Sequence, residues 1–449
     1  MIFNLIISYL PLIFLGLIGT SLYQKMKLDS GPILNILNGF AIAIVYLYFI
    51  LSLIVRFEIL KNYSHWLVLF FPIIYLAFLE REKIRIFKMV SFDVPKKHRV
   101  WIILFFILII YKLVLALYIN LNFPIFDSDA AADSRWVGLA KQIYYKGWLS
   151  PDIISTHSLG PSLISFWINR FAPRWSDSIT AFYWYLIGFQ IIVFMGITIF
   201  KLTRNKLVSL FSVFMVVFSP LFFIHLIRPG FSDLIVAYFL IGLVSHLLFL
   251  LYSGDKKHLY VSLIFFLGAL LTKKEALIWS LIIYFCSGSV YLYKRNKGQL
   301  KSILFFELLI IFIFYTLYLL LAEKIRSNFI LTPGLENLFI VTYDVSVIKG
   351  FLVNVFGFNS FGLLWWFYFS CITILFIKTK NRETKFLITQ MVIIWLIFFY
   401  ASCFTGNGIY VLLGGNTGRG LMQLLFLILP LPILAYAKFE KGNYWQISG

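Results

Sequence analysis

The sequence predicts an all-α, multi-pass bundle of transmembrane helices. Two features of the composition support this prediction: 61% of the 449 residues are hydrophobic, and only 13% are charged. A third is that apolar runs of about 20 residues, enough to cross ~30 Å of hydrocarbon, alternate with short basic segments. The formal charge of +20 therefore indicates membrane topology rather than nucleic-acid binding.

Hydropathy along the chain predicts about thirteen spans. The first begins at the N-terminus, which lacks the basic region and small-residue cleavage site of a signal peptide, so we expect it to be retained. We group the spans into an added N-terminal unit of about three helices (1–99), a core (100–322) and a C-terminal part (323–449). The expected spans are residues 2–23, 33–55, 66–79, 100–119, 178–200, 207–225, 231–252, 259–272, 276–293, 302–322, 350–377, 386–404 and 421–437.

Basic residues distinguish the two sides of the membrane. With the N-terminus outside, 24 of the 39 Lys and Arg residues lie in short inside loops. The other side holds 14, and five of these belong to one long loop, residues 120–177. The positive-inside rule therefore places loop 120–177 outside, as the first external loop of the core.

This external loop opens with three carboxylates within seven residues, Asp127, Asp129 and Asp133. One interpretation is structural, because an acid can cap a helix or favour the positive end of its dipole, for about 0.5–1 kcal/mol each. The other is chemical, because one cap is sufficient and three neighbouring like charges repel one another. A carboxylate beside an apolar surface can act as general base for an acceptor hydroxyl or amine.

The rest of the loop predicts two short interfacial helices. Trp136 and Tyr144 belong to an amphipathic pattern that Gly147 is suited to end. A second helix is expected to begin at Pro161, a residue that fits the first helical position, and to carry Trp167. We expect both helices to lie on the surface of the bundle, with their aromatic side chains at headgroup depth.

The order of these motifs resembles the GT-C superfamily of glycosyltransferases, in the branch that contains the protein O-mannosyltransferases and the lipid A aminoarabinose transferase. In that family an acid after the first core span precedes an aromatic helix and a turn to the membrane, here Gly160-Pro161-Ser162-Leu163. The chain departs from the family in having Trp136 where a Tyr is usual. Further segments that fit in order are Arg228-Pro229-Gly230-Phe231-Ser232-Asp233, Leu271-Thr272-Lys273-Lys274-Glu275 and Gly418-Arg419-Gly420, so that the resemblance covers residues 100–437.

The resemblance implies a membrane glycosyltransferase with an extracytoplasmic active site, in the plasma membrane of a bacterium or archaeon. Its donor would be a polyprenyl-phosphate sugar, and its acceptor a lipid, glycan or protein. Direct displacement would invert the anomeric carbon. The implied site residues are Asp129, Asp133 or Asp127 as general base, Arg419, Lys273 and Lys274 as ligands of the donor phosphate, and Asp233, Arg228 and His157 in the substrate cavity.

Structural alternatives exist for most of these residues. Asp233 stands where a helix cap is expected. Lys273 and Lys274 interrupt an apolar stretch and can extend toward lipid headgroups or pair with an acid. His157 fits an ordinary polar loop. The guanidinium of Arg419 is suited to bidentate phosphate contact, and the glycine-rich segment before it allows a close approach.

The sequence predicts no metal site and no cofactor. The six histidines lack metal-ligand spacing and the three cysteines form no paired motif, although a divalent ion beside the donor phosphate stays open. Two other functions also stay open. A transporter or lipid flippase would show repeated halves with interrupted helices. A lipid-linked polysaccharide ligase or polymerase would need a diphosphate-linked donor.

Overall fold

The computed structural model describes residues 2–26, 31–77, 98–124, 126, 136–149, 159–273, 275–294, 308, 312, 341–357, 363–405 and 416–440. Helices make up most of these ranges, and no strand forms within them. Within the same ranges one isolated β-bridge joins Val341 to Thr405. The all-α fold predicted from composition is confirmed.

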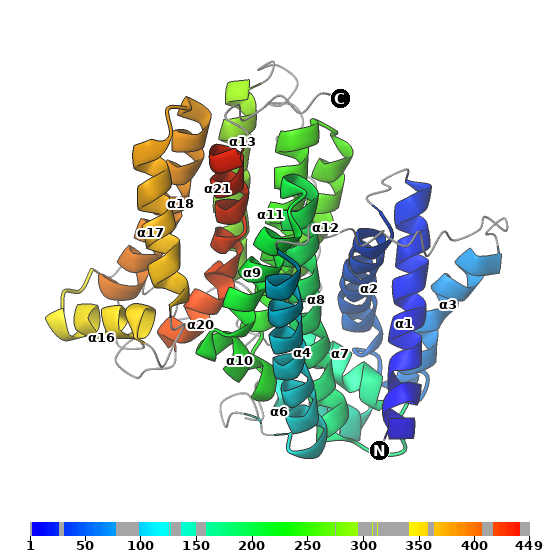
Figure 1. The fold of residues 1–449 in the computed structure, drawn as a ribbon. Helices are drawn as coiled ribbons and strands as arrows, with labels where there is room; N and C mark the ends of the chain where they lie inside the picture. Colours follow the sequence, from blue (N-terminus) through cyan, green and yellow to red (C-terminus); the bar gives the residue numbers. More distant parts are fainter. Residues whose placement is uncertain are drawn as a thin grey trace.

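Long apolar helices form the body of the molecule (Figure 1). Six helices of the described residues are long and apolar enough to cross a membrane, and a bent pair, α9 with α10, brings the number to seven if counted as one span. These helices are those of an integral membrane protein. The six are α1 (Ile2–Lys25), α2 (Pro32–Ile54), α4 (Arg99–Asn122), α8 (Asp177–Thr203), α11 (Asp233–Ser253) and α18 (Arg382–Cys403).

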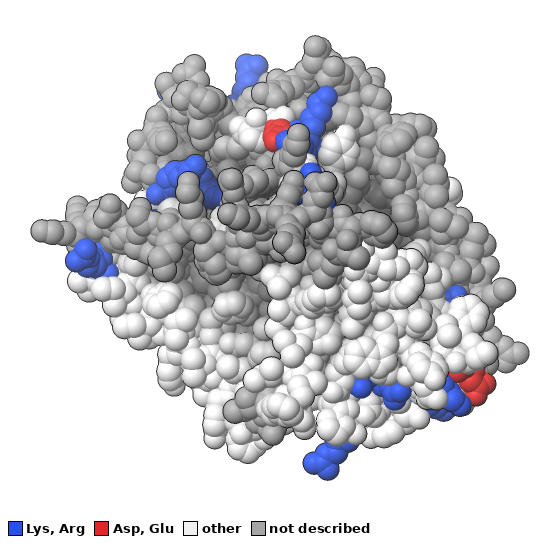
Figure 2. All heavy atoms as spheres, turned by 90° about the vertical axis from the view of Figure 1, so that its right-hand side faces the viewer, with Lys and Arg blue, Asp and Glu red and all other residues white. Residues whose placement is uncertain are grey.

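Helix α11 is the centre of the fold, because every residue from Asp233 to Leu250 is buried. Helix α8 and the shorter helices α12 (Lys257–Thr272) and α13 (Glu275–Lys294) pack against it. Helix α4, in contrast, exposes a row of large apolar side chains such as Val100 and Ile107. Figure 2 shows a broad uncharged surface, with the described charged side chains lying mainly toward the top and bottom of the view. Such a surface suits contact with lipid.

The expected span 207–225 is not one straight helix. It divides into α9 (Lys206–Val217) and α10 (Pro220–Ile227), which are bent by 67°. The hydroxyl of Ser219 accepts a hydrogen bond from the Phe222 amide at 3.4 Å, and Pro220 begins the new helix. Proline has no N–H to continue the hydrogen-bond ladder of the preceding helix, so the bend is set locally.

Two expected spans of the C-terminal part are also divided. Residues 350–377 contain the end of α16 (Val345–Phe356) and most of α17 (Leu364–Lys378). Residues 421–437 contain a 3₁₀ segment, η4 (Leu424–Ile428), followed by α21 (Pro430–Glu440). Pro430 cannot donate to the preceding turn, which explains the second division. The expected span 302–322 lies outside the described residues except for positions 308 and 312.

Both helices expected in the external loop are present. Helix α6 (Trp136–Lys146) ends at Gly147, whose φ of 78° lies in the left-handed region that glycine tolerates best. Helix α7 (Gly160–Asn169) carries Pro161 in its first turn. The two tryptophans of these helices are covered by other parts of the protein, because Trp136 and Trp167 are 1% and 0% exposed.

The N-terminal helices explain the burial of Trp167. The indole Nε1 of Trp167 donates to the carbonyl of His65, in α3 (Ser64–Ala77), at 3.1 Å. The amide of Leu149 donates to the carbonyl of Val55, after α2, at 2.7 Å. A 3₁₀ turn, η1 (Glu58–Leu60), connects α2 with α3. Through these contacts the N-terminal helices pack against α7 and cover its aromatic face.

Several short helices gather at one end of the bundle, the lower part of Figure 1, which we call the short-helix end. It contains α6, α7, α10, α16 and α20 (Asn416–Gln423). Helix α20 packs against α10, α11 and α16. The start of α11 and the loop between α10 and α11 therefore lie among these short helices.

Candidate functional site

A buried carboxylate at the start of α11 is the centre of the candidate site. Asp233 is 0% exposed, and its Oδ1 accepts hydrogen bonds from Lys273 Nζ at 2.9 Å and from Gln423 Nε2 at 2.6 Å. The three residues come from the start of α11, the end of α12 and the end of α20. We call them the Asp233 cluster. It joins segments that are 40 and 190 residues apart in sequence.

Lys273 occupies the break between α12 and α13. Helix α12 has 16 residues and stops at Thr272, and Lys273 follows in an extended conformation with φ −159° and ψ 139°. At 1.5 Å per residue such a helix measures only about 24 Å, less than the ~30 Å of a bilayer core. The lysine can therefore stand at the end of a short helix without entering the middle of the membrane.

The end of α12 is held by hydroxyl groups from two helices. Thr272 Oγ1 donates to the carbonyl of Gly268 at 2.7 Å, and it lies 3.3 Å from the hydroxyl of Tyr48 in α2. Thr272 is 0% and Tyr48 is 1% exposed. These contacts fix the backbone immediately before Lys273 and connect it to the N-terminal helices.

The turn before Asp233 is held from three sides. Asn120 Nδ2 of α4 donates to the carbonyl of Leu226 at 2.6 Å, and Trp184 Nε1 of α8 donates to that of Phe231 at 2.8 Å. The Phe231 ring meets the Trp136 ring edge to face, with 5.9 Å between centroids. Gly230 has a φ of 122°, which a side chain would strain. The carboxylate of Asp233 is thus positioned by a rigid turn.

The electrostatics of the cluster are those of a buried ion pair. Asp233 lies in the first turn of α11, where the helix dipole favours negative charge. The Lys273 side chain is 14% exposed, whereas that of Asp233 is 0% exposed. Removing one partner of such a pair typically costs about 3–5 kcal/mol, because a charge is then left buried alone. Lys273 is therefore the charged member that a ligand can reach, and Asp233 is the group that holds it.

The structure brings together only some of the residues expected from sequence. Asp233 and Lys273 are in contact, so an acid is a partner of this lysine. Arg228 ends α10 and is exposed. Arg419 lies in α20, one helical turn before Gln423. The remaining candidates lie outside the described residues and are Asp127, Asp129, Asp133, His157 and Lys274.

Gln423 is a site residue that the sequence reasoning missed. Its one available signal is an amide within the apolar run from Leu421 to Leu429, where a polar side chain needs a partner. Trp184 and Asn120 were also missed, because in the sequence each looks like an ordinary residue of an apolar span.

No group of three metal-ligating side chains occurs among the residues that the structure describes. The divalent ion that the sequence leaves open would depend on the first-loop acids, which are outside them. Comparison with known proteins finds no matching family model, no matching curated protein and no matching solved structure. The chemistry of the site is therefore argued from its own residues.

Proposed function

We propose that the protein is a membrane glycosyltransferase that moves a sugar from a polyprenyl-phosphate donor to an acceptor on the extracytoplasmic side. The observation that carries this proposal is the Asp233 cluster, a positioned lysine at the end of a bundle of apolar helices. A cation held at this depth suits a lipid whose phosphate lies at the same level. The resemblance of the surrounding motifs to the GT-C superfamily supplies the reaction class.

Two cations would contact the donor phosphate. Lys273 is presented by Asp233, and Arg419 stands one turn before Gln423 in α20. In the reaction the bond between the anomeric carbon and the phosphate oxygen breaks, and negative charge grows on the departing phosphate. Preorganised cations stabilise this charge in the transition state. Asp233 acts as a positioning residue, because it is fully buried.

The acceptor would be activated by a first-loop acid. Asp127, Asp129 and Asp133 precede Trp136 in sequence, and the Trp136 ring packs on Phe231, two residues before Asp233. One carboxylate would accept the proton of the acceptor hydroxyl or amine while its oxygen or nitrogen attacks the anomeric carbon. A direct displacement of this kind inverts the configuration of that carbon.

The proposal is tested with detergent-solubilised protein. A panel of synthetic undecaprenyl-phosphate pentoses and hexoses is incubated with a cell-envelope extract as acceptor, and released undecaprenyl phosphate is measured by mass spectrometry. We expect release with at least one donor, and a loss of about 10²-fold in at least one of Asp127→Asn, Asp129→Asn and Asp133→Asn.

The same assay separates this function from its rivals. A transporter or flippase cannot produce free undecaprenyl phosphate in detergent, where no two compartments exist. A polysaccharide ligase or polymerase would act only on a diphosphate-linked oligosaccharide, which is included as a second donor class. Full activity in all three Asn variants would show that none of these aspartates is the general base.

A further inference from the structure

Helix α16 differs from the spans because it lies across the bundle at the short-helix end, instead of along it (Figure 1). Asp344 caps its start, accepting hydrogen bonds from the amide of Ser346 at 2.7 Å and from its hydroxyl at 2.6 Å. The helix ends at Phe356, before Gly357. These local signals explain why the helix is separate from α17.

One face of α16 is fixed to the bundle. Val347, Phe351 and Val355 are buried, at 5%, 2% and 0% exposure. The Phe351 ring lies 5.7 Å from the ring of Phe398 and 5.2 Å from that of Phe399, both in α18. This face therefore holds the helix in place.

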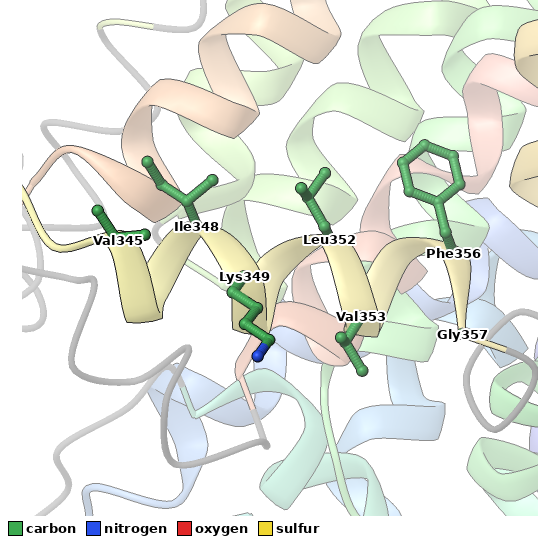
Figure 3. A pocket seen from close by; sticks show the side chains of 7 residues that line it. All are labelled: Val345, Ile348, Lys349, Leu352, Val353, Phe356 and Gly357. Carbon is green, nitrogen blue, oxygen red and sulfur yellow. The ribbon is translucent and has the colours of Figure 1, made fainter.

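The outer flanks of α16 form an open groove of about 580 Å³. Figure 3 shows Ile348, Leu352 and Phe356 in a row on one side of the helix and Lys349 and Val353 on the other. Leu352 and Val353 are 45% and 61% exposed. Among the described residues, the lining is thus apolar except for Lys349. This lysine is exposed and forms no ion pair with a carboxylate of the described residues.

Exposed aromatic residues indicate how deep in the membrane this groove lies. Tyr343 just before α16, Trp366 in α17 and Tyr400 in α18 are 71%, 50% and 48% exposed. Trp366 Nε1 donates to the carbonyl of Phe356 at 3.1 Å, and the two rings lie 4.7 Å apart. Exposed Trp and Tyr side chains gather where hydrocarbon meets headgroups. Helix α16 therefore lies at headgroup level, with the lipid-facing side of α17 next to it.

We infer that this groove binds an anionic phospholipid of the surrounding membrane. The Lys349 ammonium contacts the lipid phosphate, and an acyl chain lies along Ile348, Leu352 and Phe356. Phe356 contacts Trp366 of α17, and Phe367 and Ile374 of that helix are exposed apolar side chains that can receive the rest of the acyl chain. The single positive charge in an apolar lining matches a lipid with one phosphate charge. This binding goes beyond the proposed transfer reaction and does not depend on it.

Native mass spectrometry of the whole protein in detergent tests the inference. Phosphatidylglycerol is titrated against the parent, Lys349→Gln and Lys349→Arg, with phosphatidylcholine as the neutral lipid. We expect the first phosphatidylglycerol to bind about fivefold more weakly to Lys349→Gln, the factor that one lysine contributes near anionic lipid. Lys349→Arg should keep the affinity. Leu352→Asn should weaken phosphatidylglycerol binding as well, because the acyl-chain row is interrupted.

Lys146→Gln is the matched control, because Lys146 is also exposed at the short-helix end but lies on α6. It should bind phosphatidylglycerol as the parent does. Equal affinity of the parent and Lys349→Gln, or equal binding of both lipids by the parent, would overturn the inference. Displacement of phosphatidylglycerol by millimolar inorganic phosphate would also overturn it, since the site would then bind a free anion rather than a lipid.

Discussion

The Lys273 ammonium lies 2.9 Å from Oδ1 of Asp233, where one helix of the core ends and another begins. Each of the two residues stands at the boundary of an apolar helix. The pair gives a membrane-embedded cation a fixed location and a counter-charge. It also separates two roles, because the lysine is partly accessible and the aspartate is not.

The pair should show strong coupling in stability. Lys273→Met leaves the buried Asp233 carboxylate without its cation and should cost about 3–5 kcal/mol. Asp233→Asn with Lys273→Met removes both charges and keeps a carbonyl oxygen for Gln423, so the double variant should recover most of this loss. Thermal unfolding in detergent measures all three proteins.

Lys141→Met is the control for this cycle. Lys141 and Asp177 form an ion pair at 3.0 Å whose side chains are 37% and 39% exposed. Breaking this partly exposed pair should change stability by no more than about 1 kcal/mol. A similar effect for Lys141→Met and Lys273→Met would show that burial does not strengthen the Asp233 pair.

Two tryptophans provide a second matched comparison. Trp184 and Trp366 each donate Nε1–H to a backbone carbonyl, at 2.8 Å and 3.1 Å, but Trp184 is 0% and Trp366 is 50% exposed. Trp184→Phe should cost about 1–3 kcal/mol in unfolding free energy, because the part-buried Phe231 carbonyl loses that donor. Trp366→Phe should cost less than about 0.5 kcal/mol, since water can replace the indole. The reverse order would contradict this account of the turn.

The sequence could predict helix starts and ends that single residues determine. Gly147 ends α6 and Pro161 opens α7 as expected, because each residue sets its own backbone geometry. Ser219 and Pro220 carried an equally local signal for the bend between α9 and α10, but a hydropathy window averages over it. Gln423 carried the signal of an amide in an apolar run, but its partner could not have been predicted, because Asp233 is 190 positions away in sequence.

What covers the helices of loop 120–177 could not be predicted for a related reason. The amphipathic pattern of α6 is real, but it does not say what covers its apolar side. The N-terminal helices bury Trp167 through His65 and bring Val55 to Leu149. Such pairing between distant segments is not visible in the periodicity of either one.

The sidedness of the molecule is tested by cysteine labelling in a background with Cys286, Cys371 and Cys403 changed to Ser. Lys146→Cys, at the end of α6, should react with an impermeant thiol reagent in intact cells. Lys256→Cys, before α12 and at the other end of the bundle, should react only after the cells are opened. Labelling of Lys256→Cys alone in intact cells would place the Asp233 cluster inside the cell.

Arg419 should act mainly on the chemical step. Arg419→Lys keeps the charge without the planar guanidinium and should retain part of the activity, while Arg419→Ala should retain very little. The charge of the leaving phosphate grows as the glycosidic bond breaks, so the loss should persist at saturating donor. If Arg419→Ala turned over as fast as the parent protein, Arg419 would be only an interfacial anchor.

The most direct test of the central claim is the turnover of the double variant Asp233→Asn, Lys273→Met. Because this protein is expected to fold, its activity reports on the lysine rather than on stability. The release of undecaprenyl phosphate at saturating donor should fall by about 10²-fold or more, the scale of losing a preorganised charge contact, while Lys141→Met keeps the parent rate. Release at the parent rate by the folded double variant would show that the Asp233 cluster only stabilises the bundle.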